Sequence, residues 1–197
     1  MRILVIGATG TIGREIVRAL SSNHEIVSAS RKGSEIDVDI RDVSAIRDMY
    51  TRAGRLDAVI SAAGGGAWKP LAELSDEDFA TSLAYKLMGQ VNVVRYGFAH
   101  LNDGGSITTT SGVLSKSPMP GGGAISLVNA GLEGFTRAAA LEAPRGIRVN
   151  VVSPPWVTET LVAMGAKDLS HGLPAATVAL AYVRSVTGSE TGQVIEP

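Results

Sequence analysis

Short runs of apolar residues alternate along the chain with longer segments whose apolar residues recur at helical spacing. The short runs, rich in β-branched residues, predict strands at residues 2–6, 25–30, 56–61, 106–110, 147–152 and 192–195. The longer segments predict helices at residues 11–20, 43–53, 76–101, 124–143 and 175–186. Strands of nearly continuous apolar character are buried on both faces, so the alternation predicts a parallel sheet covered by helices on each side. With right-handed crossovers, the expected fold is a doubly wound α/β sheet in three αβα layers, forming a single domain over residues 1–197.

Composition narrows the class of protein without defining its chemistry. Apolar residues make up 45% of the 197 residues and charged residues 19%, as in an ordinary globular domain. A net charge of −1 favours neither nucleic acid nor an anionic membrane surface as a partner, and no apolar run reaches membrane-spanning length. The chain has no cysteine, and His24, His100 and His171 are isolated in sequence, so no metal site is expected. Without a targeting segment, a cytoplasmic location is expected.

The first predicted strand runs directly into a glycine-rich turn, residues 7–13 (GATGTIG), that opens the first predicted helix. Glycines at such a turn let backbone amides approach a pyrophosphate, and the helix N-terminus adds partial positive charge. This context is typical of a Rossmann-type dinucleotide-binding domain, although glycines can also build a turn with no ligand. The binding residues expected in this turn are Gly7, Thr9, Gly10, Thr11, Ile12 and Gly13.

The second predicted strand ends in Ser30, followed by Arg31 and Lys32. A carboxylate at this position would bind the ribose 2′-hydroxyl of NAD, whereas a guanidinium suits the 2′-phosphate of NADP. Ser30 and Arg31 therefore predict NADP as the cofactor in preference to NAD. A solvated basic turn is the alternative.

Several further segments, spread in order over nearly the whole chain, resemble the short-chain dehydrogenase/reductase family. They are residues 39–42 (DIRD), 61–64 (SAAG), 104–112 (GGSITTTSG), 146–154 (GIRVNVVSP) and 191–195 (TGQVI). The resemblance implies that Asp39 and Ile40 contact the adenine of the cofactor. It also implies that the cofactor is bordered by Ala62, Ala63, Gly64, Pro154 and Val157.

The catalytic positions depart from the pattern of this family. The family's tyrosine position falls at Ile125, its lysine position at Asn129, and its serine position at Gly112, beside Ser111. The position of the family's helical asparagine is occupied by Lys86. In the family the tyrosine transfers a proton, while the lysine lowers the tyrosine pKa and holds the nicotinamide ribose. The chain thus resembles a small atypical bacterial subgroup without these residues, and the catalytic candidates are Lys86, Ser111 and Asn129.

Two readings of Lys86 remain open at this point. Partial desolvation would lower the pKa of its ammonium and make it a substitute proton donor. Alternatively, it extends its charge to solvent at a subunit interface. Its neighbour Tyr85 is expected to face away from it on the same helix.

The segment after the sixth strand, residues 154–159 (PPWVTE), also departs from the family's PGxxxT pattern. Pro155 replaces the glycine, and Glu159 replaces the threonine. A carboxylate near a pyrophosphate is unfavourable unless it is paired. Trp156 is expected either as a lid or wall of the substrate pocket or as a cap on the core.

The expected function is that of an NADP(H)-binding oxidoreductase that acts on a small carbonyl or alcohol with a non-standard proton donor. Two alternatives stay open: a catalytically inactive dinucleotide-binding sensor or scaffold, and a non-redox isomerase or cyclase on the same fold. The resemblance further implies a homodimer or homotetramer formed through the helices predicted over residues 83–101 and 124–143. A small-molecule substrate is expected, with neither nucleic acid nor membrane as a partner.

Overall fold

The computed structural model describes residues 1–197 and shows a main sheet of seven parallel strands in the order β3-β2-β1-β4-β5-β6-β9. A separate two-stranded ribbon pairs β7 with β8. The strands are β1 (Arg2–Ile6), β2 (Glu25–Ser30), β3 (Ile36–Asp37), β4 (Leu56–Ser61), β5 (Leu101–Thr110), β6 (Arg148–Val152), β7 (Trp156–Val157), β8 (Gly172–Leu173) and β9 (Val194–Ile195). The helices are α1 (Thr11–Leu20), α2 (Val43–Ala53), α3 (Asp76–Ser82), α4 (Gly89–Gly97), α5 (Gly123–Glu142), α6 (Thr158–Ala163) and α7 (Ala175–Thr187). None of these helices combines the length and the apolar character needed to cross a membrane.

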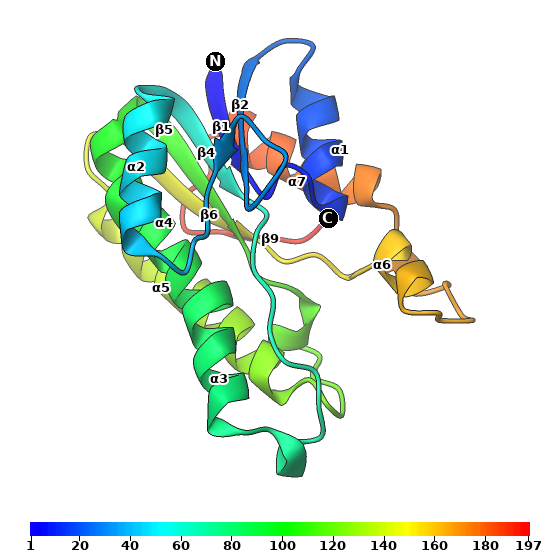
Figure 1. Ribbon diagram of the computed structural model, residues 1–197. Coiled ribbons are helices and arrows are strands. Elements are labelled where there is room, and N and C mark those ends of the chain that lie inside the picture. Colours follow the sequence, from blue (N-terminus) through cyan, green and yellow to red (C-terminus); the bar gives the residue numbers. More distant parts are fainter.

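Helices cover both faces of the main sheet, with α1 and α7 on one side and α2, α4 and α5 on the other (Figure 1). The strands bury side chains in both directions because successive residues point to opposite faces. Ile3 and Val5 of β1 lie in one core cluster with α1 and α7, whereas Leu4 and Ile6 lie in the other with α2 and α4. The predicted doubly wound α/β fold of Rossmann type is therefore confirmed.

Capping side chains explain where two of the helices begin. The carboxylate of Asp42 accepts a hydrogen bond from the backbone N–H of Ser44 at 2.7 Å, which starts α2. Helix α3 starts with a capping box, in which Ser75 Oγ accepts from the backbone N–H of Asp78 and the Asp78 carboxylate accepts from that of Ser75. Both helices therefore begin where a side chain satisfies amides that the helix itself leaves without partners.

The helix predicted over residues 76–101 is confirmed as one continuous helical segment as far as His100, but it is not α-helical throughout. The chain forms α3, a π-helical turn at Leu83–Met88, α4, and a 3₁₀ turn at Phe98–His100. Leu101 already belongs to β5, where it is buried and pairs with Leu56 of β4. Residues 102–105 are polar or glycine, so the apolar pattern hides the first half of this strand. A π-helical turn keeps the hydrogen-bonded helix continuous and leaves no distinct pattern in the sequence.

The pattern of apolar residues does not predict β3, β7, β8 or α6. The three strands have only two residues each, and α6 only six, which is too short for a period to emerge. The last strand is also shorter than predicted, since only residues 194–195 pair with β6. The remaining predicted elements differ from the observed ones by one residue at an end, if at all.

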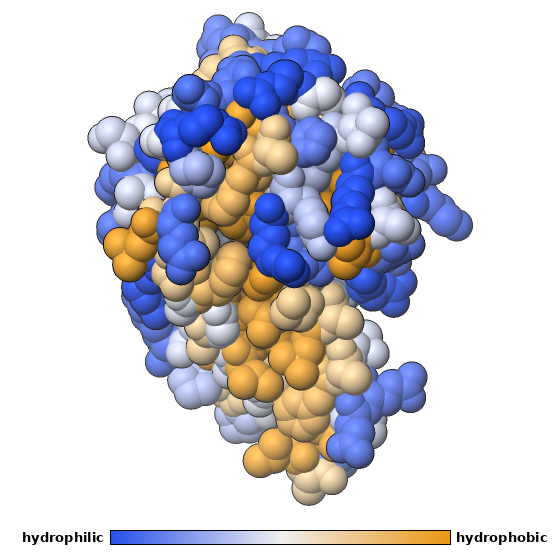
Figure 2. Space-filling model, turned by 90° about the vertical axis from the view of Figure 1, so that its left-hand side faces the viewer, coloured by the Kyte–Doolittle hydropathy of each residue, from blue (hydrophilic) through white to orange (hydrophobic).

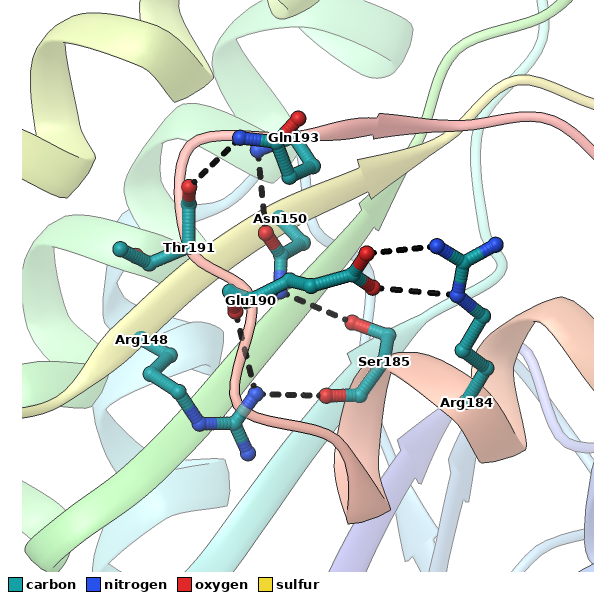
Figure 3. Close-up of polar contacts among 7 residues, drawn as sticks. All are labelled: Arg148, Asn150, Arg184, Ser185, Glu190, Thr191 and Gln193. Carbon is teal, nitrogen blue, oxygen red and sulfur yellow. Dashed lines mark hydrogen bonds and ion pairs between the residues drawn. The ribbon is translucent and has the colours of Figure 1, made fainter.

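A buried polar cluster around Asn150 holds the C-terminal segment on the sheet (Figure 3). Asn150 Nδ2 donates to the carbonyl oxygen of Glu190 at 2.8 Å and to Ser185 Oγ at 3.3 Å. Its Oδ1 accepts a hydrogen bond from the backbone N–H of Gln193 at 3.1 Å. The Arg148 guanidinium donates to the Ser185 carbonyl oxygen at 2.7 Å. These bonds satisfy a fully buried amide and tie α7 and β9 to β6.

We expect Gly13→Ala to destabilise the fold, because a Cβ atom at Gly13 would lie 2.0 Å from the carbonyl oxygen of Gly7. Backbone must move to relieve this contact, at a cost of roughly 1–3 kcal/mol. Gly134→Ala is the matched control, since a Cβ atom there would meet nothing within 4 Å. That helical substitution should stabilise the protein by roughly 0.5–1 kcal/mol. Urea denaturation measures both free energies of unfolding, and equal values for the two variants would contradict the prediction.

Candidate functional site

Two adjoining cavities open at the edge of the sheet where the parallel strands end, which is where ligands bind in open α/β sheets. The first has a volume of about 450 Å³ and lies between the β1–α1 turn and the ends of β2 and β4. The predicted cofactor-binding residues that line it are Gly7, Thr9, Gly10, Ser30, Arg31, Ile40, Ala62, Ala63 and Gly64. It is also lined by Ile6, Lys32, Val38 and Tyr85, which were not predicted.

The floor of this first cavity is a backbone cradle that leaves no room for side chains. Gly7 has φ of +86°, and a Cβ atom there would lie 2.8 Å from the carbonyl oxygen of Ala62. A Cβ atom on Gly13 would lie even closer to backbone, 2.0 Å from the carbonyl oxygen of Gly7. Thr11, Ile12 and Gly13 form the first turn of α1 beside the cavity, where backbone amides have no partner within the helix. This arrangement can hold an anion such as a pyrophosphate.

Basic side chains surround Tyr85 at the β2 end of the first cavity. The guanidinium carbons of Arg31 and Arg41 lie 5.7 and 5.8 Å from the centre of the Tyr85 ring, within the range of a cation–π contact. Arg41 Nε also donates to the Asp39 carboxylate at 3.0 Å, and this hydrogen bond lowers the pKa of Asp39. The Asp39 side chain does not line the cavity. Ser30 Oγ donates to the Lys32 carbonyl oxygen at 2.9 Å, so this hydroxyl is used within the turn.

The second cavity, of about 360 Å³, lies beside the first. Its lining includes five further predicted site residues: Lys86, Ser111, Asn129, Pro154 and Val157. The predicted residues Thr11, Ile12, Gly13 and Asp39 line neither cavity. Gly64, which lines the first cavity, packs against Lys86, and a Cβ atom on Gly64 would lie 2.9 Å from Lys86 Cδ. The two cavities therefore meet at this contact.

Lys86 is the one charged residue that lines the second cavity. Its side chain is buried, and Nζ donates to the carbonyl oxygen of Ser111 at 3.0 Å. Burial lowers the pKa of Lys86 to about 8. Because an ammonium has three donors, two remain for other acceptors. Its neighbour Tyr85 lines the first cavity instead, so the prediction that the two side chains face different ways is confirmed.

The burial of Lys86 also excludes the reading in which its charge reaches solvent at the surface of this chain. Lys86 lies in the π-helical turn between α3 and α4. Such turns occur frequently at functional sites.

Ser111 lines the second cavity, but its hydroxyl is used elsewhere. Ser111 Oγ donates to Glu133 Oε1 at 3.0 Å, and Ser115 Oγ donates to the same oxygen at 2.6 Å. Glu133 is buried in α5, and the two hydroxyls stabilise its charge. The sequence reasoning missed Glu133, because a glutamate in the middle of a helix is usually exposed.

Helix α5 presents Ile125 and Asn129 to the second cavity. Asn129 Nδ2 donates to the carbonyl oxygen of Gly112 at 3.3 Å, whereas Asn129 Oδ1 is buried and has no hydrogen-bond partner. An unsatisfied buried acceptor is unfavourable by roughly 1–3 kcal/mol, so a donor on a ligand would stabilise this site.

Comparison with known proteins identifies the family. A family model described as enoyl-(acyl carrier protein) reductase matches residues 8–195. The chain belongs to the short-chain dehydrogenase/reductase family. The protein lin1944 from Listeria innocua is 38% identical, with a TM-score of 0.96 over 100% of this chain and 98% of that one. A small-chain dehydrogenase in complex with NADPH is 28% identical, with a TM-score of 0.90 over 100% of this chain and 96% of its own.

Hydroxynaphthalene reductase arp2 from Aspergillus fumigatus is 30% identical over 156 residues, which cover 77% of this chain and 55% of that protein. The chain therefore spans about half the length of this and a similar curated reductase. The resemblance to the short-chain dehydrogenase/reductase family stated from the sequence is confirmed.

In this short-chain dehydrogenase/reductase, the carboxylate of Glu159 is paired. It accepts hydrogen bonds from the backbone N–H of Ala175 at 3.0 and 3.2 Å. Ala175 begins α7, so the charge of Glu159 also lies at a favourable helix N-terminus. The unfavourable unpaired carboxylate considered from the sequence is therefore not present. Trp156 lines the second cavity and is not part of either core cluster, which favours a pocket wall over a cap on the core.

Lys86→Met keeps most of the side chain and removes the buried charge. The folded pKa of about 8 lies below the ordinary 10.5, so between these pH values the folded chain binds fewer protons than the unfolded one. The stability of the unmodified protein should therefore rise with pH across this window, by up to roughly 3 kcal/mol relative to Lys86→Met. Below pH 8 Lys86 is charged in both the folded and the unfolded protein. In this range the free energy of unfolding of Lys86→Met should exceed that of the unmodified protein by the largest amount. Urea denaturation across this range measures the difference, and a constant difference would show that the pKa of Lys86 is not lowered.

Proposed function

We propose that this chain is an NADP(H)-dependent reductase of small carbonyl compounds in which Lys86 replaces the family's tyrosine as proton donor. The observation that carries the proposal is the contact between Gly64 and Lys86, which joins a glycine-lined cradle to a cavity that holds one buried ammonium. Membership of a family of oxidoreductases supports it, as does the NADPH complex of the 28% identical dehydrogenase.

The first cavity fits a dinucleotide in both shape and charge. The cradle at Gly7 and Gly13 would be filled by any Cβ atom, and the free amides of α1 would hold the pyrophosphate. Arg31 and Lys32 would bind the 2′-phosphate, which favours NADP over NAD. Ile40 would contact the adenine, whereas the Asp39 carboxylate is held by Arg41 outside the cavity. When bound, the nicotinamide supplies the hydride that carbonyl reduction requires.

The chain's own residues would complete the reaction in the second cavity. The Lys86 ammonium would donate a hydrogen bond to the oxygen of the substrate carbonyl. It would then release a proton to that oxygen as hydride addition converts it to an alkoxide. A pKa of about 8 leaves this group mostly protonated at neutral pH, yet acidic enough to transfer the proton. The free Oδ1 of Asn129 would accept a hydrogen bond from a ribose hydroxyl, at the position where the family uses lysine. Ser111 would contribute through its carbonyl oxygen, which positions Lys86.

A dinucleotide-binding sensor without turnover is the second candidate. Ile125, at the family's tyrosine position, favours this candidate because its alkyl side chain cannot donate a proton. The Lys86 ammonium is then the one ionisable group in the lining of the second cavity that could do so. In a sensor the first cavity would bind NADPH as proposed, while no carbonyl compound would be reduced.

We also propose that the chain forms a homodimer or homotetramer through α4 and α5, together with the π-helical turn before α4. Met88 in this turn and Leu127 and Leu141 in α5 are exposed. Figure 2 shows apolar side chains gathered on the side of the molecule where α2, α4 and α5 lie. An interface between copies would remove this surface from water.

Arg31→Ala should weaken NADPH binding by roughly 1–3 kcal/mol, because it removes a charge-assisted contact to the 2′-phosphate. NADH lacks this phosphate, so its affinity should change little. Calorimetric titration of NADPH, NADP⁺ and NADH into the unmodified protein and the variant measures both effects. Arg18→Ala, an exposed substitution outside the cavity, is the control. Equal losses for NADPH and NADH would show that Arg31 does not bind the 2′-phosphate.

Lys86→Met should lower the rate of carbonyl reduction by roughly 10²–10⁴, the contribution of a general acid. In the unmodified protein the rate should fall as the pH rises through about 8, because the neutral amine cannot donate a proton. Lys86→Arg keeps the positive charge but does not titrate in this range, so it should abolish that fall. The oxidation of NADPH with a panel of ketones and aldehydes measures the rates. Turnover that is unaffected by Lys86→Met would refute the role of Lys86, and NADPH binding without any turnover would support the sensor.

A further inference from the structure

The chain has two tryptophans, and both line the second cavity. Trp68 belongs to the loop between β4 and α3, and Trp156 belongs to β7. Their ring centres lie 5.6 Å apart with an angle of 69° between the ring planes, an edge-to-face arrangement. Trp68 nevertheless keeps 39% of its surface exposed, so the pair is accessible from outside the molecule.

The backbone on both sides of Trp68 is held in place. The N–H of Ala67 donates to Ser82 Oγ at 3.0 Å, and the N–H of Lys69 donates to the carbonyl oxygen of Gly121 at 3.1 Å. Gly121 has φ of +83°, and a Cβ atom there would lie 3.0 Å from Trp68 Nε1, so glycine makes room for the indole. A large exposed aromatic side chain that is fixed in this way is typical of a binding surface.

Trp156 is positioned by a different device. It pairs with Gly172 in the β7–β8 ribbon, outside the main sheet. The two indoles thus come from segments far apart in the sequence, and their rings meet in the lining of this cavity.

The rest of the lining favours an uncharged ligand. Leu114, Ile125 and Met164 contribute apolar side chains, and Lys86 is the one charged group. That ammonium already donates to the Ser111 carbonyl oxygen, and the rest of the lining carries no charge. A carboxylate would pair with Lys86, but the cost of removing it from water offsets much of that gain, whereas a ketone oxygen accepts from a remaining donor of Lys86 at a smaller desolvation cost.

We propose that the second cavity binds a planar aromatic ketone of one or two rings, with its ring system against Trp68 and Trp156 and its carbonyl oxygen toward Lys86. Flat rings gain stacking or edge contacts with indoles that saturated rings of the same size do not. A volume of about 360 Å³ is at the small end for ligand pockets, which suits a compact molecule. The inference deepens the proposed reductase function by giving the class of substrate for the same site.

The two tryptophans make the test direct, because intrinsic fluorescence reports on this cavity alone. We would titrate the protein with 1-tetralone, with 1-decalone as its saturated counterpart, and with 2-naphthoate as a planar anion. Quenching by tetralone, with calorimetry for the ligands that do not quench, gives the affinities. We expect tetralone to bind at least about tenfold more tightly than either of the other two.

Trp68→Leu and Trp156→Leu should each weaken tetralone binding about tenfold, while Trp68→Phe should keep most of it. Each leucine variant retains one tryptophan, so the quenching of that tryptophan shows which indole the ligand contacts. An unchanged thermal unfolding midpoint shows that the variants fold. Equal binding of decalone, tighter binding of naphthoate, or full tetralone affinity in both leucine variants would overturn the proposal.

The same ligands separate this inference from the proposed function. Binding of tetralone with no reduction of tetralone or of any other carbonyl compound by NADPH would refute the reductase and leave the ligand class standing. Reduction of aliphatic ketones with no binding of tetralone would refute the ligand class and leave the reductase standing.

Discussion

All strands of the main sheet run in one direction, and helices cover both of its faces, so the chain can form a concave surface only where the strands end. Five segments of the site leave a strand at that edge, and helices supply Lys86 and Asn129. The cradle follows β1, the turn with Arg31 and Lys32 follows β2, Gly64 follows β4, Ser111 follows β5 and Trp156 follows β6. The topology therefore brings these residues together whatever their identity, and the side chains decide only which chemistry the edge can perform.

The burial of one charged side chain, that of Lys86, lowers the stability of the fold. Lys86 is a buried cation whose one partner within the protein is a neutral carbonyl oxygen, and its low pKa expresses the resulting penalty. Glu133, the nearby buried carboxylate, is by contrast stabilised by two hydroxyls. A group that is kept charged at the expense of stability in a cavity is a candidate for function on physical grounds. The free Oδ1 of Asn129 in the same cavity leads to the same conclusion.

The sequence predicts the parts of the site that depend on local pattern. The glycine turn, the basic residues after β2 and the segments that follow β4 and β6 all lie where strand ends place them. Other features depend on contacts between distant segments. The Trp68–Trp156 pair forms only in the folded chain. The π-helical turn that carries Tyr85 and Lys86 is missed for another reason, because its apolar pattern is that of an α-helix. Such features cannot be read from periodicity, because periodicity describes one element at a time.

The two edge strands of the main sheet, β3 and β9, have only two residues each. An edge strand exposes backbone donors and acceptors to which a neighbouring chain can add a strand, and long, flat edge strands are prone to aggregation. Here hydrogen bonds from Asn150 of β6 hold the backbone of Glu190 and Gln193, just before β9, so this segment stays on the edge of β6. The sheet thus offers almost no template for intermolecular strand addition. The proposed association between copies would therefore use side chains of the covering helices.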